Sequence, residues 1–408
     1  MKELRDIGRH KRFKHRTIRD FRRCNDGKIK KNVMTEQSHH DSEVLSQLTQ
    51  SFPVLDNPHP ASEQERVKMI DKPAFGQVFS DNMAHMVWQK GSGWGERRIE
   101  PFGPLMMNPG ASVLHYAQEC FEGLKAYRHA DGSTWLFRPD ANAERFANSA
   151  KRMYLPELSK EDFLGSVAAL AKRDVNWVPS RREYTLYLRP FMFASEAFLG
   201  VRAPKTVDYC VIASPSGPYF PGGIKPVSIW VEDKWFRTGP GGTGFAKCGG
   251  NYAASILGEY RGAEKGCEQV CFVDAATKTY LEELGGMNVF AVHKDGHLET
   301  PSLTGNILPG VTRRSLIQLA EDHGRNVVET MIKLDDLLED IKSGEVTEVF
   351  ACGTAAIITP IGRFKSEKFD VEVNDGRSGE LTLKLREELL GIQMGEVADP
   401  HEWMWKVC

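Results

Sequence analysis

Residues 239–255 read GPGGTGFAKCGGNYAAS and place one lysine, Lys247, inside a glycine-rich turn that precedes an expected helix. Six glycines surround this lysine within the stretch. Because glycine has no Cβ, a turn of this composition lets the backbone approach a ligand closely. We therefore expect a ligand site at Lys247.

Two nucleotide-binding motifs share this glycine-rich character, and the neighbouring residues argue against both. A P-loop requires Gly-Lys-Ser or Gly-Lys-Thr, whereas Ala246 precedes Lys247 and Cys248 follows it. A dinucleotide-binding turn follows a strand, but PGGTG follows the polar stretch WFRTG. A lysine in such a turn can instead form an imine with an aldehyde cofactor, once burial or a cationic neighbour removes its proton. A nucleotide-binding α/β protein stays open as a rival interpretation.

Outward from this turn, short β-type runs alternate with amphipathic helical stretches, which predicts a mixed α/β (α+β) fold. The expected strands lie at 83–88, 133–139, 185–193, 208–214, 226–232, 269–275 and 288–294, with a strand-turn-strand at 347–362. The expected helices lie at 143–154, at 161–177, after Gly249, after Thr312 and near 384–390.

A domain boundary is expected at PSGPYFPGGI, because its prolines and glycines interrupt any helix or strand. The predicted organisation is a basic tail at 1–33, a polar segment at 34–72, a small α/β domain at 73–214, a linker at 215–224 and a large domain at 225–408.

Composition indicates a globular protein, since 41% of the 408 residues are hydrophobic and 26% are charged. The chain has no apolar run long enough to span a membrane, and its N-terminus has no apolar signal segment, so we expect a cytoplasmic protein without a membrane partner. The eight cysteines are scattered, and no Cys or His cluster shows zinc-finger spacing. We therefore expect free thiols and no metal.

Charge is concentrated in residues 1–33, where thirteen Lys or Arg stand against four Asp or Glu. Such an arm permits contact with nucleic acid, which stays open as the rival interpretation from a different class of function. Glu3, Asp6 and Asp20 argue against an acid-poor transit peptide. Because Met34 begins a segment typical of a bacterial start, we expect a mis-started or disordered tail and no nucleic-acid partner.

Seven segments recur in a known order: HYAQECFEGLKAYR at 115–128, LYLRPF at 186–191, ASPSGPYF at 213–220, GGNYAAS at 249–255, EELGGMN at 282–288, LPGVTR at 308–313 and EVFACGTAA at 348–356. Together they resemble the branched-chain amino acid aminotransferases, from about Phe75 to the C-terminus. The resemblance implies the two-domain, D-amino-acid-aminotransferase-like fold of type IV pyridoxal phosphate enzymes, assembled as a homodimer, with the cofactor in the large domain.

The same resemblance implies reversible transfer of an amino group between L-leucine, L-isoleucine or L-valine and 2-oxoglutarate, with L-glutamate as the product. Two rivals share the fold, namely D-amino acid aminotransferase and aminodeoxychorismate lyase. They are disfavoured because HYAQECFEGLKAYR and LYLRP match the branched-chain pattern.

The resemblance also assigns cofactor contacts. Lys247 resembles the lysine that forms the Schiff base and moves the substrate's proton. Glu283 resembles the carboxylate facing the pyridine nitrogen, whereas Glu282 is expected to point to the opposite face of its strand. Tyr252 resembles the phenol that hydrogen-bonds the cofactor's 3′ oxygen, and Arg145 resembles the arginine that binds the phosphate.

Two backbone elements predict a phosphate site without help from the family. LPGVT opens a helix, so the free amides near Val311 and Thr312 attract an anion. CGTAA turns tightly after a strand and presents Thr354. Thr312 and Thr354 are therefore the candidate phosphate-contacting threonines.

The substrate site implied by the resemblance is an aromatic pocket suited to branched aliphatic side chains. Its expected walls are Phe75, Tyr116, Phe121, Tyr187 and Tyr219, with Leu199 and Val201 on a loop from the partner subunit. Arg189 is expected to pair with the distal carboxylate of glutamate, and the amides of Thr354 and Ala355 with the α-carboxylate. Without the resemblance, each aromatic residue fits ordinary core packing equally well.

Two positions depart from some members of the family. Ala356 and Thr359 stand where mammalian members carry a Cys-x-x-Cys pair, so no thiol switch is expected. Gly286 precedes Met287 where some relatives have threonine, which loosens the floor of the expected pocket. Relative preference among the three branched-chain substrates therefore stays open.

Overall fold

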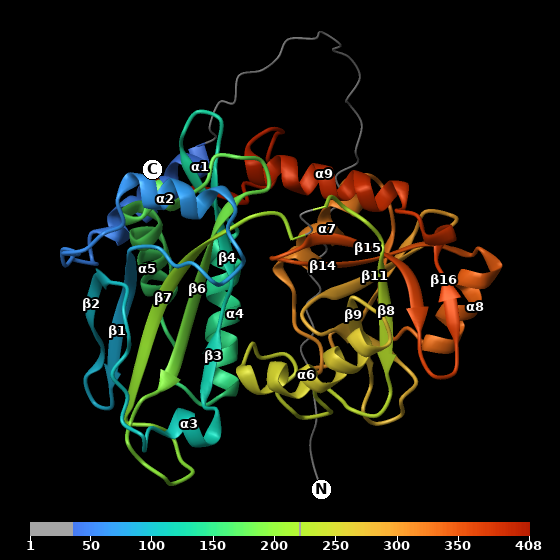
Figure 1. The fold of residues 1–408 in the computed structure, drawn as a ribbon, viewed down its shortest axis with the longest axis horizontal. Coiled ribbons are helices and arrows are strands. Elements are labelled where there is room, and N and C mark those ends of the chain that lie inside the picture. The colour runs from blue at the N-terminus through green and yellow to red at the C-terminus, as the bar shows by residue number, and fades with distance from the viewer. Residues whose placement is uncertain (1–35, 220–221) are drawn as a thin grey trace, which may run out of the picture. The chain divides into compact units, whose positions relative to one another are not determined.

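Two β-sheets organise the chain, and helices pack against both of them (Figure 1). The computed structural model describes residues 36–219 and 222–408, so the predicted basic tail at 1–33 lies outside it. The mixed α/β (α+β) character expected from the sequence is confirmed. In these described ranges, no helix has the length and apolarity needed to cross a membrane.

The first sheet is antiparallel, and in the described ranges its strands follow the order β17-β5-β4-β6-β7-β1-β2, with β3 paired to β6. Its strands are β1 (Asn82–Gln89), β2 (Gly93–Pro101), β3 (Glu119–Phe121), β4 (Leu124–Arg128), β5 (Thr134–Phe137), β6 (Thr185–Ala194), β7 (Thr206–Ser216) and β17 (Met404–Lys406).

The second sheet is mixed and follows the order β10-β9-β8-β15-β14-β11-β12-β13 within the described residues, with β16 paired to β15. Strand β8 runs parallel to both β9 and β15, and β12 runs parallel to β13. The strands are β8 (Val227–Glu232), β9 (Gln269–Val273), β10 (Leu281–Leu284), β11 (Asn288–His293), β12 (Leu298–Pro301), β13 (Val327–Thr330), β14 (Val346–Gly353), β15 (Ile357–Lys365) and β16 (Asp370–Glu372).

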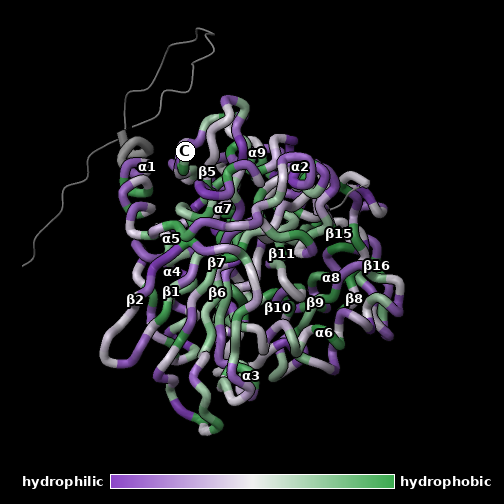
Figure 2. Tube along the Cα trace, turned by 60° about the vertical axis from the view of Figure 1, so that its left-hand side comes forward, coloured by the Kyte–Doolittle hydropathy of each residue, from purple (hydrophilic) through white to green (hydrophobic). Residues whose placement is uncertain are grey.

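The helices differ in how deeply they are buried. Helix α5 packs on β1, β6 and β7, whereas α2 has no buried residue and is mainly hydrophilic in Figure 2. The helices are α1 (Glu36–Thr49), α2 (Glu63–Asp71), α3 (Ser112–Tyr116), α4 (Pro139–Arg152), α5 (Lys160–Arg173), α6 (Gly249–Glu264), α7 (Val311–Asp322), α8 (Leu334–Ser343) and α9 (Glu380–Met394).

Packed side chains connect the two sheets. One hydrophobic cluster joins Tyr127 and Phe137 of the first sheet to Phe290 and Phe350 of the second, and it includes Trp403 near the C-terminus. Phe290 and Phe350 stack with ring centroids 5.1 Å apart. The cluster buries apolar surface from both halves of the sequence and so stabilises their contact.

The expected strands and helices are confirmed, and the structure adds elements that were not predicted, among them β2, β12, β13, β16, α3 and α8. The predicted polar segment contains α1 and α2, and α1 buries Leu45 against the first sheet's core. Strand β7 continues to Ser216 inside the predicted linker, because Pro215 loses only one possible hydrogen bond while its neighbours keep pairing with β6. The last strand, β17, pairs with β5 of the first sheet. The domain limits themselves stay a prediction.

Candidate active site

Lys247 lies between the glycine-rich turn and α6, and contacts from the first sheet's side of the chain hold its backbone. Its N–H donates to Ser149 Oγ at 2.9 Å, and its carbonyl accepts from the Phe121 N–H at 2.9 Å. At Gly244 a Cβ would overlap the backbone of Asn306, so this turn requires glycine. Hydrogen bonds to α4 and β3 therefore fix the backbone at Lys247, next to the glycine-rich turn.

The amino group of Lys247 faces two aromatic rings. Its Nζ donates to the Tyr252 hydroxyl at 2.5 Å and lies 4.7 Å from the centre of the Phe121 ring. The Phe121 and Tyr252 rings are themselves 4.9 Å apart between centroids. Because Lys247 lies just before α6 and Tyr252 lies in the first turn of that helix, the two side chains reach the same space.

Glu283 lies buried on β10 beside this space. Its Oε1 accepts from the Leu308 N–H at 3.0 Å, and its Oε2 accepts from Asn288 Nδ2 at 3.3 Å. Arg237 Nη2 lies 2.5 Å from Oε1. Burial raises the pKa of Glu283 to about 7, although the charges of Arg237 and Lys247 and the Leu308 amide act to lower it.

The neighbouring carboxylate has a different partner. Glu282 accepts from Asn306 Nδ2 at 2.7 Å, and burial raises its pKa as well. Adjacent residues of a strand point to opposite faces, which accounts for the separate partners of Glu282 and Glu283. Of the two carboxylates, Glu283 is the one whose pKa the charge of Lys247 lowers.

Backbone donors gather where α7 begins. Gly310 precedes the helix and provides no side-chain cap, so the first amides, at Val311 and Thr312, have no side-chain acceptor within residues 36–219 and 222–408. A Cβ at Gly310 would overlap the Asn288 side chain, so a larger residue there would displace Asn288. Arg145 Nη1 donates to the Pro309 carbonyl at 3.3 Å, which places the guanidinium beside this helix end. The donors suit an anion such as a phosphate.

Arg145 is held by a carboxylate that the sequence reasoning missed. Its Nε and Nη2 donate to the two oxygens of Glu122 at 2.6 and 2.8 Å, so the planar fork expected to bind phosphate is directed at Glu122. Asn142 Nδ2 and the Gly123 N–H also donate to Glu122. Burial acts to raise the pKa of Glu122, but the charge and hydrogen bonds of Arg145, the charge of Lys247 and the Gly123 amide together outweigh burial, and the pKa is lowered. One N–H of Nη1 and one of Nη2 are left for a further acceptor.

The turn at Thr354–Ala356 joins β14 to β15 and lies beside the segment that carries Gly286 and Met287. A Cβ at Gly353 would touch Gly286 and Met287, so the two segments are in close contact. Met287 is buried, whereas Gly286 is exposed. The Ala355 carbonyl accepts from the buried Lys125 at 3.0 Å. Burial lowers the pKa of Lys125 to about 8.

Part of the predicted substrate pocket forms one cluster with Lys247. The rings of Phe75 and Tyr187 meet edge to face at 5.0 Å. Arg189 Nη2 donates to the Tyr187 hydroxyl at 3.3 Å, and its guanidinium carbon lies 4.8 Å from the Phe121 ring centre. Among the described residues, the buried Nε of Arg189 has no hydrogen-bond partner. An acidic ligand group would satisfy it.

The other predicted pocket residues lie on exposed segments. Tyr116 donates its hydroxyl to the Leu199 carbonyl at 2.5 Å, which connects α3 to the loop after β6. Leu199 is 64% exposed and Val201 is 86% exposed. Tyr219 is also exposed, and its hydroxyl accepts from Gln269 at 3.4 Å. All four side chains are thus exposed in the single chain.

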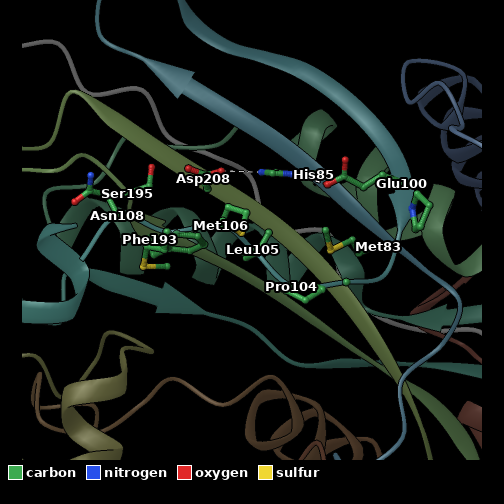
Figure 3. A pocket seen from close by; sticks show the side chains of 13 residues that line it. Met83, His85, Glu100, Pro104, Leu105, Met106, Asn108, Phe193, Ser195 and Asp208 are labelled. Atoms are coloured by element: carbon green, nitrogen blue, oxygen red, sulfur yellow. Dashed lines mark hydrogen bonds and ion pairs between the residues drawn. The ribbon is translucent and has the colours of Figure 1, made fainter. Parts of the chain in front are cut away.

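A separate cavity of about 440 Å³ lies on the first sheet. Figure 3 shows His85 pointing toward Asp208 within it, and the two groups are 2.8 Å apart. Its lining residues include none of the predicted cofactor or substrate residues. The cavity therefore does not belong to the cluster around Lys247.

Comparison with known proteins agrees with the sequence resemblance. A sequence model of the family described as amino-transferase class IV matches residues 119–364. A branched-chain-amino-acid aminotransferase of Mycobacterium tuberculosis is 50% identical over 357 residues, which are 86% of this chain and 97% of that protein. The chain belongs to the branched-chain aminotransferase family. Its members transfer amino groups, so the chain is an enzyme, a transferase.

Other branched-chain aminotransferases are less similar in sequence and match a comparable share of the chain. Branched-chain-amino-acid transaminase 1 of Bacillus subtilis is 44% identical over 334 residues, 82% of this chain and 94% of that protein. The crystal structure of the Escherichia coli branched-chain amino acid aminotransferase matches with a TM-score of 0.66 and 27% identity, covering 80% of this chain and 100% of that one. The expected type IV fold is thereby confirmed.

Proposed function

We propose that this branched-chain aminotransferase moves the amino group of L-leucine, L-isoleucine or L-valine to 2-oxoglutarate, and back, with pyridoxal phosphate as its cofactor. The convergence of Lys247, Tyr252 and Glu283 carries the proposal. A second solved branched-chain amino acid aminotransferase, crystallised with pyridoxamine 5'-phosphate, matches this chain with a TM-score of 0.65 at 26% identity.

The side chains and amides fit the chemistry of this cofactor. Lys247 provides the amine for an aldehyde, Glu283 a buried carboxylate for the pyridine nitrogen, and Tyr252 a phenol for the ring oxygen. The uncapped start of α7, with Thr312, and the Nη1 of Arg145 provide donors for a phosphate. When bound, pyridoxal phosphate supplies an electron-withdrawing ring that stabilises negative charge on the substrate's Cα.

Each residue then has a defined task. Lys247 Nζ accepts the proton that leaves Cα and returns it in the reverse reaction. Glu283 would hold the ring nitrogen, and a positive charge on that nitrogen would lower the pKa of the carboxyl and keep it ionised. Tyr252 orients the amino group of Lys247 through their hydrogen bond. The buried pair of Glu122 and Arg145 positions the donors at the start of α7.

Substrate selection follows from the aromatic cluster. Burying a branched aliphatic side chain among such rings is worth roughly 1.5–3 kcal/mol. Arg189 would pair with the distal carboxylate when glutamate occupies the same space, because its Nε lacks a partner among the described residues. The amides of Thr354 and Ala355, on the turn between β14 and β15, would hold the α-carboxylate common to both kinds of substrate.

The cofactor and the lysine are tested together by visible absorption. The purified wild-type protein, incubated with pyridoxal phosphate and dialysed, is expected to be yellow and to bleach on addition of L-leucine but not D-leucine. Lys247→Ala is expected to lose the yellow absorption, whereas Lys265→Ala, a surface lysine paired with Glu367, keeps it. A colourless wild-type protein would refute the proposal and favour nucleotide binding, and bleaching by D-leucine alone would favour a D-amino acid aminotransferase.

We also propose a homodimer in which the loop carrying Leu199 and Val201 reaches the partner's substrate site. The high exposure of both side chains in the single chain supports this arrangement. Lys247→Ala and Val201→Asp are each expected to be inactive. Co-refolding equal amounts should restore about a quarter of the wild-type activity, because one site of each mixed dimer is complete. Failure of mixed dimers to regain activity would argue against a shared site.

A cytoplasmic location and the absence of a nucleic-acid partner stay predictions from the sequence. Deleting residues 1–33 tests the second of them. The truncated enzyme is expected to keep its absorption and activity, and the full chain is expected to show no salt-dependent binding to DNA or RNA.

A further inference from the structure

Two histidines and a glutamate meet on the hairpin formed by β11 and β12. The His293 N–H donates to the His297 carbonyl at 3.0 Å, and Val292 lies opposite Leu298 in the register. Side chains alternate along a strand, so Val292 and Leu298 enter the hydrophobic cluster shared by the two sheets. The side chains of His293, His297 and Glu299 therefore lie together on the other face.

The distances between their ligand atoms suit one metal ion. His293 Nε2 lies 3.5 Å from one oxygen of Glu299, and His297 Nε2 lies 3.9 Å from the other. One nitrogen or oxygen from each residue lies within 4.8 Å of the others. A tetrahedral zinc ion with bonds of about 2.0–2.2 Å separates its ligands by roughly 3.4 Å, close to the two distances to Glu299. The His293 and His297 rings stack with centroids 4.0 Å apart, so they would have to rotate for both nitrogens to face one ion.

A second carboxylate prepares His297 for coordination. Asp295 Oδ1 lies 2.6 Å from His297 Nδ1, within the turn of the hairpin. When Nδ1–H donates to this carboxylate, the lone pair is left on Nε2, the nitrogen that faces Glu299. A carboxylate that fixes the orientation and tautomer of a histidine in this way is a regular neighbour of metal ligands.

The buried nitrogen of His293 is an independent sign of a ligand. His293 is 9% exposed, and its Nε2 has no hydrogen-bond partner among the described residues. The nearest acceptor, Glu299, is at ion-pair distance only. A buried polar atom without a partner is costly, and a metal ion between the three side chains would satisfy it.

We propose that His293, His297 and Glu299 bind a divalent transition metal, with Zn²⁺ as the ion they suit best. Two imidazoles and one carboxylate favour Zn²⁺ over Mg²⁺ or Ca²⁺, which prefer oxygen ligands. Three protein ligands leave the fourth position to water. The ligands lie across a hairpin, at a spacing unlike that of a zinc finger, which is why the sequence predicted no metal. The site is separate from Lys247 and would hold β11 against β12.

The proposal is tested by calorimetric titration of the metal-stripped, cofactor-loaded enzyme with Zn²⁺. The wild type is expected to bind one equivalent that His297→Ala and Glu299→Gln lose, or bind at least about tenfold more weakly. The control is His323→Ala, a nearby histidine paired with Glu388, which should keep this equivalent. All proteins carry Cys408→Ser, because this thiol is exposed. Binding elsewhere on the chain would be common to every variant.

A second readout does not depend on heat of binding. Co²⁺ in a tetrahedral site gives intense visible absorption, which the wild type should show and His297→Ala should lack. Zn²⁺ should also raise the Tm of the wild type and of His323→Ala, but not that of His297→Ala. Equal stoichiometry, affinity and Tm response in wild type and ligand variants would overturn the proposal, as would no saturable binding in the wild type.

Discussion

Arg237 Nη2 lies 2.5 Å from Glu283 Oε1, and both side chains are almost completely buried. The pair sits where the carboxylate must remain charged for the proposed chemistry, although burial raises its pKa to about 7. The charge of Arg237 thus opposes the effect of burial on the pKa of Glu283 before any ligand arrives.

Replacing Arg237 with methionine is expected to raise the pKa of Glu283 further, because the charge that lowers it is gone. The acid limb of the kcat/KM profile for L-leucine should therefore move to higher pH, with about tenfold loss at neutral pH for each unit of displacement. Arg237→Lys keeps the charge and should keep the profile. A uniform loss at all pH values in Arg237→Met would contradict this explanation.

Replacing Glu122 with glutamine is expected to lower the free energy of unfolding by roughly 3–5 kcal/mol, because it leaves Arg145 as an uncompensated buried charge. Urea denaturation of the apoenzyme measures this loss. Glu339→Gln, which breaks an exposed pair with Lys342, serves as the control and should cause no measurable change. Equal losses of unfolding free energy in Glu122→Gln and Glu339→Gln would show that the buried pair stabilises the fold no more than the exposed pair.

Gly123→Ala is expected to displace the Tyr187 ring, because the added Cβ would overlap the Tyr187 hydroxyl. Since Tyr187 also contacts Phe75 and Arg189, KM should rise for leucine and for 2-oxoglutarate. Adding Tyr187→Phe removes the overlapping atom and should recover part of the loss. Additive effects of the two changes in steady-state kinetics would contradict a steric cause.

Arg189→Leu is expected to separate the two half-reactions. Loss of the cation should raise KM for 2-oxoglutarate roughly 10- to 100-fold, the equivalent of one charged hydrogen bond. KM for L-leucine should change only a few-fold, since its side chain has no carboxylate. Single-turnover measurements with each substrate give the comparison, and equal losses for both substrates would remove Arg189 from the proposed role.

The His85 cluster is expected to give a pH-dependent contribution to stability. Burial lowers the pKa of His85, but hydrogen bonds to Asp208 and Glu100 outweigh it and the pKa is raised. The histidine's contribution is therefore present below about pH 6.5 and is lost as pH rises through the raised pKa. The two carboxylates have lowered pKa values despite burial, and their contribution is lost in acid.

Comparison of wild type with His85→Gln should consequently show the largest difference in unfolding free energy between about pH 4.5 and 6.5. Urea denaturation across this range measures it. A difference that is constant with pH, or that grows above neutrality, would be incompatible with a protonated His85 between two carboxylates.

Local patterns predicted the fold and the centre of the site because their causes are local. The glycines around Lys247 and the start of α7 at Val311 are readable from neighbouring residues. The separate partners of Glu282 and Glu283 follow from strand alternation alone. Such features require no knowledge of how distant segments meet.

The missed residues depend on contacts between distant segments. Glu122 and Arg145 come from different elements, and only folding reveals that they pair. Arg237 lies in the polar stretch that precedes the glycine-rich turn. Asn288 is the last residue of EELGGMN, in which Glu283 was the expected cofactor contact. For Glu122, the signal was a carboxylate inside an otherwise apolar run, CFEGL, which needs a buried partner.

Strand β17 places the last residues of the chain on the edge of a sheet whose other strands lie between Asn82 and Ser216. During synthesis, β5 therefore emerges long before the strand that covers it. Its free edge stays available to other chains until Met404–Lys406 have been made. Assembly of the first sheet thus waits for a strand that follows β5 by more than 260 residues, and loss of Met404–Lys406 would leave that edge unprotected.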